Sequence, residues 1–499
     1  MRKKVVILFV LFIPLTSIKA QRETKDTLDV VSNPFISPKF SFKVFLSLVN
    51  SGRIDTKAAC EWFHKQSKQG WNGLVRMVTA TRLIGFFVKH SSSFDTIKGG
   101  NSTVYRTAAS SLTNMFISFL GEDWVPSEVL HEFFSFFRGD RKKLAQLLKN
   151  VSFKTVADDK KYLVMDMLLS TPRVREARAM LLTELKKAIS EQRWGNVWLI
   201  YRALASMGIG APLPVLVQTA RRCPLLSFFL ARTVRTAGGD PKEWKLQVPD
   251  KENILNLFCP KRKHVDRIDI MFSSAVSEKT IDKIASLVVQ YLKFAGEVLG
   301  LNLPKKVKLC VFGTLDEMYA FIWPNSVAYH PYPDSFFIAK EGVIYVAPLS
   351  NKRRWQTHPD YMGQLLKTTL YQTTWLLLDS AGCPSFPLKT ALSSAIPLLF
   401  AKQAGLSLPT SDNLLKDACM LAPPDKKNLL NIIRKVQIAE LRHDPLKFSV
   451  VAAQFILFLT KSAPESFQRM VKNFIQKKEP PSTKLIERNW VAFLEWLKD

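Results

Sequence analysis

The chain contains little histidine and cysteine for its length, and both are scattered. Its 499 residues include seven histidines and six cysteines, and no two cysteines form a C-x-x-C pair or a zinc-knuckle pattern. The sequence also lacks the G-x-x-x-x-G-K-[ST] loop, the G-x-G-x-x-G turn and the G-x-S-x-G elbow. Nucleotide chemistry and serine hydrolysis therefore have no support in the sequence.

The six cysteines leave two alternatives open. An oxidising compartment would permit disulfides, but the wide spacings are equally compatible with buried free thiols, and sequence alone cannot choose a pairing. The cysteines are Cys60, Cys223, Cys259, Cys310, Cys383 and Cys419.

Acidic residues are in a clear minority. The chain has 71 Lys and Arg against 42 Asp and Glu, a formal net charge of +29. Such a charge predicts attraction to an anionic polymer or a membrane surface, with simple solubility as the alternative explanation. The basic residues occur in short, dispersed groups and form no long run, so a nucleic-acid partner is less favoured.

The N-terminus has the features of a secretory signal. Met-Arg-Lys-Lys precedes the apolar run Val5–Leu15, and Ala20 provides the small residue after which we predict cleavage. The run is well short of the ~20 residues that a membrane span needs, which favours a cleaved signal over an uncleaved anchor. We expect a signal peptide over 1–20, a flexible leader over 21–38, and a periplasmic or secreted mature chain.

Residues 39–236 follow a helical pattern throughout. Apolar residues recur at spacings of three and four, as in Arg175–Glu191, and short Gly-, Pro-, Asp- and Ser-containing connections separate the segments. The pattern predicts an all-helical domain, either a solenoid of helical repeats or an irregular bundle. Ala237–Pro241 is the clearest boundary signal, and 237–263 is predicted to be a linker.

From residue 264 onwards, strand and helix patterns alternate. Asp266–Phe272 and Lys306–Phe312 alternate like strands, and Ser277–Leu299 between them is typical of a long amphipathic helix. A short helix at Asp316–Trp323 and one or two strands within Ser335–Pro348 are expected to follow. The predicted closing helices are Phe448–Leu459, Ser466–Ile475 and Ile486–Leu497. The predicted fold class is α+β and mostly helical, with a small mixed sheet and a helical C-terminal part in a domain over 264–499.

One neutral stretch is expected to form the centre of this domain. Met362–Leu378 carries a single charge, Lys367, and Asp360 can cap the start of the helix. A helix that is apolar or neutral on all sides is typically buried. A second apolar helix, Leu388–Ala401, is expected after a Cys-Pro-Ser-Phe-Pro turn.

Two adjoining helices of this kind resemble the zinc-site architecture of the gluzincin metallopeptidases. The order of elements resembles the peptidase MA-like domain of that group, over about Val265 to Lys498. The likeness is carried by the strand–helix–strand of Ile268–Phe312, the short segment Thr314–Phe321, the strand Gly342–Val346 and the closing helices. In the family, the first buried helix carries H-E-x-x-H and the second supplies a glutamate to the zinc.

The residues that would bind zinc are missing from this chain. Thr368-Thr369-Leu370-Tyr371-Gln372 stands in place of H-E-x-x-H, and the third-ligand position falls at Thr390 or Lys389. A catalytic zinc needs three donor side chains and an open position for water. The resemblance therefore implies a pseudoenzyme without catalytic residues, metal or cofactor. The vestigial positions are Thr368, Thr369, Gln372 and Thr390.

The predicted function is a secreted or periplasmic binding or scaffold protein with a protein or peptide partner. One alternative is a basic, polyanion-binding envelope protein. Another is an active zinc metallopeptidase with displaced ligands. The candidate ligands for such a site are His330 with Asp334, His358 with Asp360, and His443 with Asp444.

Overall fold

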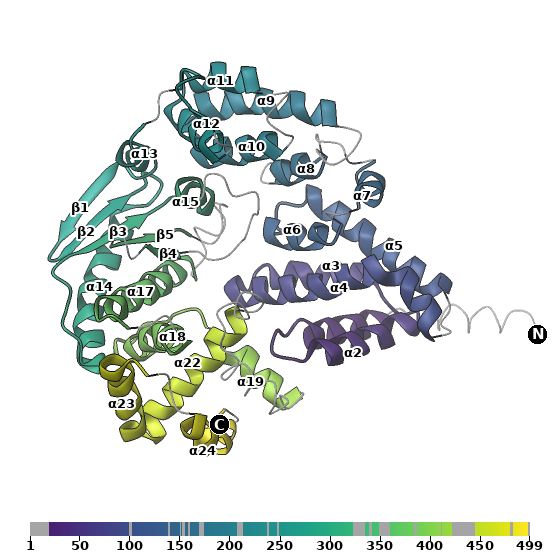
Figure 1. The fold of residues 1–499 in the computed structure, drawn as a ribbon. Coiled ribbons are helices and arrows are strands. Elements are labelled where there is room, and N and C mark those ends of the chain that lie inside the picture. Colours follow the sequence, from purple (N-terminus) through teal and green to yellow (C-terminus); the bar gives the residue numbers. More distant parts are fainter. Residues whose placement is uncertain are drawn as a thin grey trace, which may run out of the picture. The chain divides into compact units, whose positions relative to one another are not determined.

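The computed structural model divides the chain into two compact units (Figure 1). One comprises residues 1–172 and 411–425, and the other residues 173–410 and 426–499. The structure describes residues 19–98, 102–137, 140–149, 151, 155–157, 160–168, 174–206, 213–236, 239–246, 249–322, 335–338, 342–348, 360–383, 387–410, 412–421, 445–479 and 483–497. The predicted signal peptide lies outside these residues except for its last two.

The first unit is helical in its described residues. Its core is aromatic: the Phe116 ring stacks on Phe133 at 4.2 Å between centroids, and Phe63 meets Phe116 edge-on at 5.7 Å. Asp55 caps one helix by accepting hydrogen bonds from the amides of Lys57 and Ala58. The elements are a helix over 19–31, α2 (Pro38–Asn50), α3 (Thr56–Gln66), α4 (Gly70–Lys98), α5 (Ser102–Ser118), η1 (Phe119–Gly121), α6 (Ser127–Ser135), α7 (Arg141–Leu147), α8 (Lys161–Leu168) and α19 (Asp412–Leu421).

The segment 21–38 is not the flexible leader that its polar composition suggests. It is helical as far as residue 31, and Leu28 and Val31 are 2% and 1% exposed. The indole nitrogen of Trp62 donates a hydrogen bond of 2.8 Å to the Asp29 carboxylate. Sparse apolar residues at helical spacing are enough to pack this helix, because the opposite face is left to solvent.

The second unit begins with helices that the sequence analysis assigns to the preceding domain. Helix α10 packs against α15, and Trp198 stacks on Tyr319 with 6.2 Å between ring centroids. A Cβ at Gly195 would lie 3.1 Å from that of Asp316, so glycine allows the close approach. The boundary expected at 237–263 thus falls inside this unit. The elements are α9 (Val174–Ser190), α10 (Trp194–Ser206), α11 (Leu213–Ala220), α12 (Pro224–Thr236), α13 (Lys251–Phe258) and α15 (Leu315–Ile322).

The second unit contains a five-stranded mixed sheet in the order β1-β2-β3-β5-β4. The three inner strands are parallel, and each edge strand is antiparallel to its neighbour. The fold is therefore α+β and mostly helical, as predicted from the sequence. The strands are β1 (Lys261–Val265), β2 (Ile268–Phe272), β3 (Val307–Val311), β4 (Ser335–Ile338) and β5 (Val343–Val346).

Edge strand β1 begins in a segment that we expected to be a linker. We expected a linker there because the sequence of β1 is almost entirely basic. Lys261, Arg262, Lys263 and His264 pair residue by residue with β2. The turn between the two strands puts Asp266 at a φ of 53°, a left-handed conformation that aspartate tolerates. Charged side chains on an edge strand discourage pairing with another chain.

Helix α14 (Glu278–Leu299) connects β2 to β3, as the sequence predicts. Ser277 caps its start by accepting from the amide of Thr280, and Gly300, at a φ of 65°, ends it. Figure 1 shows α14 and α17 (Asp360–Ser380) packed together beneath the sheet. The chain closes with α18 (Pro387–Gln403), α22 (Pro445–Ser462), α23 (Pro464–Lys472), η3 (Asn473–Lys477) and α24 (Thr483–Trp496). No helix in the described part of the chain is long and apolar enough to cross a membrane.

The helix over 19–31 yields a test of its packing. Leu28→Ala should lower the free energy of unfolding of the first unit by about 2–4 kcal/mol, because truncating a core leucine leaves a cavity. Arg22→Ala, at a side chain 84% exposed on the same helix, should change it by less than about 0.5 kcal/mol. Urea denaturation followed by circular dichroism measures both. Equal, small effects would mean that this helix is not packed.

Candidate functional site

The helix pair α17 and α18 holds the positions singled out by the sequence. Helix α17 packs against α14, α18, β4 and β5, so it is enclosed as its neutral composition predicts. Leu365, Leu370 and Leu378 are each at most 1% exposed. Gly382 lies just beyond the end of α17 and has a φ of 68°. Its amide donates a hydrogen bond to the Asp379 carbonyl.

The residues of α17 that stand in place of H-E-x-x-H are buried. Thr368, Thr369 and Gln372 are 5%, 0% and 7% exposed, while Thr390 on α18 is half-buried. The Thr369 hydroxyl donates to the Leu365 carbonyl at 2.8 Å. The structure therefore brings the vestigial positions to adjoining helices but uses them for packing.

Neighbouring threonines on α17 repeat the same hydrogen bond. Thr373 donates to the Thr369 carbonyl at 2.8 Å and Thr374 to the Leu370 carbonyl at 3.0 Å. The Thr374 hydroxyl also pairs with that of Tyr291, whose pKa burial holds above its usual range. A threonine that bonds to the carbonyl four residues earlier satisfies its polarity within its own helix. These hydroxyls can therefore lie in an apolar interface at little cost.

A buried ion pair lies next to these positions. Lys389 on α18 is completely buried, and its ammonium is 2.9 Å from the Asp379 carboxylate and 4.4 Å from the centre of the Trp375 ring. Both the carboxylate and the ring face stabilise the positive charge. A fixed positive charge at this point repels any metal ion nearby.

Sequence reasoning placed Lys389 as a possible ligand position but missed its partner. The signal was present, since Asp379 is the only acid between Tyr361 and Phe400. A buried charge on one helix is expected to pair with an opposite charge nearby. The Trp375 indole nitrogen and the Ser393 hydroxyl were also missed; both atoms are buried and have no hydrogen-bond partner. Buried polar atoms without a partner cost stability.

Within the described residues, no group of three His, Cys, Asp or Glu side chains is arranged to hold a metal ion. The alternative ligands His330, Asp334, His358, His443 and Asp444 lie outside the described residues. Asp360 begins α17, and its side chain also lies outside the description. A displaced metal site thus remains a hypothesis to be tested by metal analysis.

The cysteines whose side chains are described are free thiols. Cys223, Cys259, Cys310 and Cys383 are buried, and Cys60 is partly exposed. Burial raises the pKa of Cys259 well above its ordinary value, and the neighbouring Cys310 and Glu317 add to the rise. Buried thiols of this kind are inert rather than nucleophilic.

The Glu317 carboxyl group has a strongly raised pKa. Burial raises that pKa from 4.5 to about 7, although hydrogen bonds from the amides of Gly313 and Thr314 oppose the rise. The Thr314 hydroxyl accepts from the Glu317 amide at 3.2 Å, and the Glu317 carboxylate accepts from the Thr314 amide at 3.2 Å. This reciprocal pair is a capping box that begins α15. Glu317 therefore has a structural role, and the rise in its pKa comes from burial.

No model of a known protein family matches the chain, and no curated protein is significantly similar to it in sequence. The class of this protein must therefore be argued from its own residues.

The ion pair between α17 and α18 can be tested by a double-mutant cycle. Asp379→Asn should lower the free energy of unfolding by about 1–3 kcal/mol, because it leaves the buried Lys389 ammonium without a counter-charge. The effect is smaller than for a fully enclosed pair, since the Asp379 side chain is 38% exposed. Adding Lys389→Met should restore most of the loss. A double variant no more stable than Asp379→Asn would contradict this account.

The raised pKa of Glu317 predicts a dependence of stability on pH. The folded state binds this proton more tightly than the unfolded chain does. The stabilisation is therefore complete below pH 4.5 and is lost as the pH rises towards 7. Relative to the wild type, Glu317→Gln should gain up to about 3 kcal/mol over that interval. Urea denaturation of both proteins across this pH range measures the difference. Parallel pH profiles would show that Glu317 titrates normally.

Proposed function

We propose that this chain is a non-catalytic binding or scaffold protein. Its second unit would be a degenerate form of the peptidase MA-like domain, and it would act outside the cytoplasm after loss of residues 1–20. The proposed partner is a protein or peptide, and the net charge of +29 would favour an anionic polymer or membrane surface nearby.

The order of elements in the second unit supports the resemblance. Strand β2, the long helix α14 and strand β3 are followed by the short helix α15, strand β5 and the buried helix α17. These are the elements on which the likeness to the metallopeptidase domain depends. In the chain, α18 follows α17 after a short proline-containing stretch of sequence, which supports the likeness to the zinc-site framework.

The buried Lys389 is the observation that carries the non-catalytic proposal. A catalytic zinc needs three donors and an open position in a cavity that admits water and substrate. At Lys389, one of the two positions that would correspond to the third ligand, this protein has an ammonium group that is 0% exposed and paired with Asp379. The threonine hydroxyls of α17 are bonded to their own helix. An interface of this kind supports a structural role for α17 and α18.

Metal analysis of the full mature chain, purified without chelator, tests the proposal. We expect less than about a tenth of an equivalent of zinc by elemental mass spectrometry, because the framework lacks three donor side chains. A triple variant, Thr368→Ala, Thr369→Ala and Gln372→Ala, should have the same metal content as the wild type.

Zinc near one equivalent, lost to a chelator, would overturn the non-catalytic proposal. It would favour the metallopeptidase with displaced ligands. The separate variants His330→Ala, His358→Ala and His443→Ala would then identify which residues bind the metal.

A further inference from the structure

Three neighbouring helices of the first unit contain almost no acidic residues. Helices α2, α4 and α5 pack against one another, and together they include seven lysines and arginines but a single acid, Asp95. The whole chain has 71 Lys and Arg to 42 Asp and Glu, so these helices are far more basic than the chain as a whole. A local excess of positive charge attracts anionic partners.

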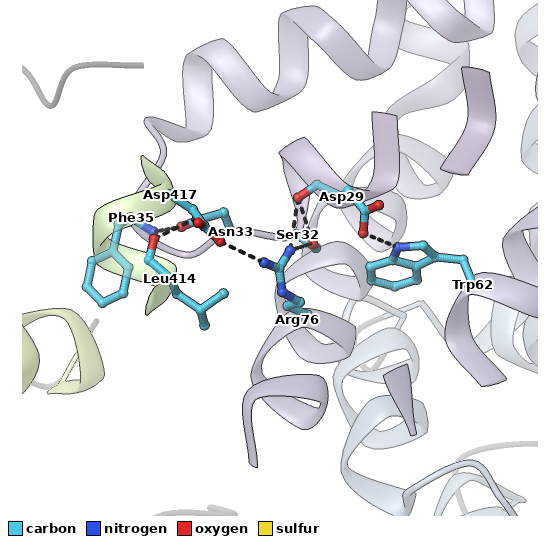
Figure 2. Close-up of polar contacts among 8 residues, drawn as sticks. All are labelled: Asp29, Ser32, Asn33, Phe35, Trp62, Arg76, Leu414 and Asp417. Carbon is cyan, nitrogen blue, oxygen red and sulfur yellow. Dashed lines mark hydrogen bonds and ion pairs between the residues drawn. The ribbon is translucent and has the colours of Figure 1, made fainter. Parts of the chain in front are cut away.

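Two arginines of α4 are neutralised within the protein. The Arg76 guanidinium donates to the Asp29 carbonyl at 3.1 Å and lies 3.3 Å from the Asp417 carboxylate, as Figure 2 shows. Arg82 is 2.9 Å from the Glu132 carboxylate. These two side chains serve the fold and leave little charge for a partner to meet.

Three lysines of the same helices keep their charge at the surface. Lys39 and Lys43 on α2 and Lys89 on α4 have exposed side chains, and none of them forms an ion pair with another described residue. By contrast, the cations of strand β1 are paired with acids of α13 and α14. The positive charge of the three lysines is therefore available to a partner.

Aromatic rings reach the surface beside these lysines. Phe40 on α2 and Phe86 on α4 are 41% and 42% exposed, and the described part of the first unit exposes no other large apolar side chain to this extent. The Phe86 ring meets that of Phe42 edge-on at 5.5 Å between centroids and lies 4.8 Å from the His90 ring. Exposed apolar groups that adjoin one another mark an interaction surface.

Helical spacing places lysine and ring on the same side of each helix. On α2, Lys39 is four residues and Phe40 three residues before Lys43, and on α4 Phe86 is three residues before Lys89. Residues at these spacings are neighbours on the surface of a helix. The ring contacts between α2 and α4 make the two surfaces adjoin. We call these five exposed side chains the basic aromatic face.

We propose that the basic aromatic face binds the surface of an anionic membrane. The three lysines would contact anionic lipid headgroups, and the rings of Phe40 and Phe86 would lie at the boundary with the acyl chains. Such binding draws on buried apolar area and on attraction to anionic lipid, and this face offers both. Its role rests on the membrane contact included in the proposed function, but not on the absence of catalysis, which metal analysis tests separately.

A nucleic acid is the other anionic partner that basic and aromatic groups recognise. Non-specific binding of a single strand uses a positively charged groove with ring faces open to the bases. Here Phe86 already packs against two rings, and the cleft that the structure describes in this unit is lined by three aspartates against two cations, Lys65 and Arg76. These observations favour a membrane surface.

Cosedimentation of the full mature chain with lipid vesicles tests the proposal. We expect binding to vesicles of equal parts phosphatidylcholine and phosphatidylglycerol, and none to vesicles of phosphatidylcholine alone. No binding to the anionic vesicles would overturn the proposal. Binding of a single-stranded oligonucleotide in place of vesicles would also overturn it and would assign the face to nucleic acid.

A charge variant localises the contact. Lys39→Gln, Lys43→Gln and Lys89→Gln together should weaken binding to the anionic vesicles about a hundredfold, because each lysine near an anionic surface contributes about fivefold.

The matched control removes the same net charge from the same unit, at the exposed lysines Lys57, Lys65 and Lys68. Lys57→Gln, Lys65→Gln and Lys68→Gln together should leave binding within about threefold of the wild type, since these lysines lie outside the face. Equal losses in the two triple variants would show attraction by total charge alone and contradict the proposal.

An aromatic variant tests insertion without changing any charge. Phe40→Ala with Phe86→Ala should weaken binding to the anionic vesicles about tenfold, because less apolar area enters the membrane. Phe40→Trp with Phe86→Trp should bind at least as tightly as the wild type, since tryptophan favours the membrane interface. Thermal melting followed by circular dichroism checks that both variants are folded. Unchanged binding by the folded alanine variant would rule out insertion of the rings and overturn the proposal.

Discussion

The burial of α17 is the constraint on which the second unit depends. This helix contacts the sheet, α14 and α18, so a polar group on it costs stability unless it finds a hydrogen-bond partner. Its threonines meet the requirement by bonding to their own helix. The one lysine that enters from α18 meets it through Asp379 and the Trp375 ring. These threonine hydroxyls and the Lys389 ammonium are therefore all paired within the protein.

Much of this unit could be predicted from sequence, because its signals are local. The neutral run of α17, the amphipathic period of α14 and the alternation in β2 and β3 each reflect burial within a single element. Strand β1 was missed because a basic edge strand has the composition of a linker. The boundary was misplaced because Gly238 and Gly239 look like a hinge, whereas the packing of Trp198 on Tyr319 joins α10 to α15 across more than a hundred residues.

The candidate sites were predicted only in part, for a related reason. Sequence identified Thr368, Thr369, Gln372, Thr390 and Lys389 by their place along two helices, yet the partners of a side chain depend on tertiary packing. Asp379 was visible as a lone acid, but its distance from Lys389 was not. The contacts of α19 within the first unit were invisible, since Asn33, Arg76 and Asp417 have no fixed spacing and come together only when the helices pack.

The return of the chain to its first unit has a consequence for biosynthesis. Asn33 bonds to Leu414 and Arg76 to Asp417, contacts that span 381 and 341 residues. Helix α19 must therefore leave the ribosome before the N-terminal unit can be completed. Until then its docking surface is exposed, and closing so long a loop is slow. During translation, the polar groups of Asn33 and Arg76 therefore stay hydrated until α19 has been synthesised. Only then can the early helices form their final contacts.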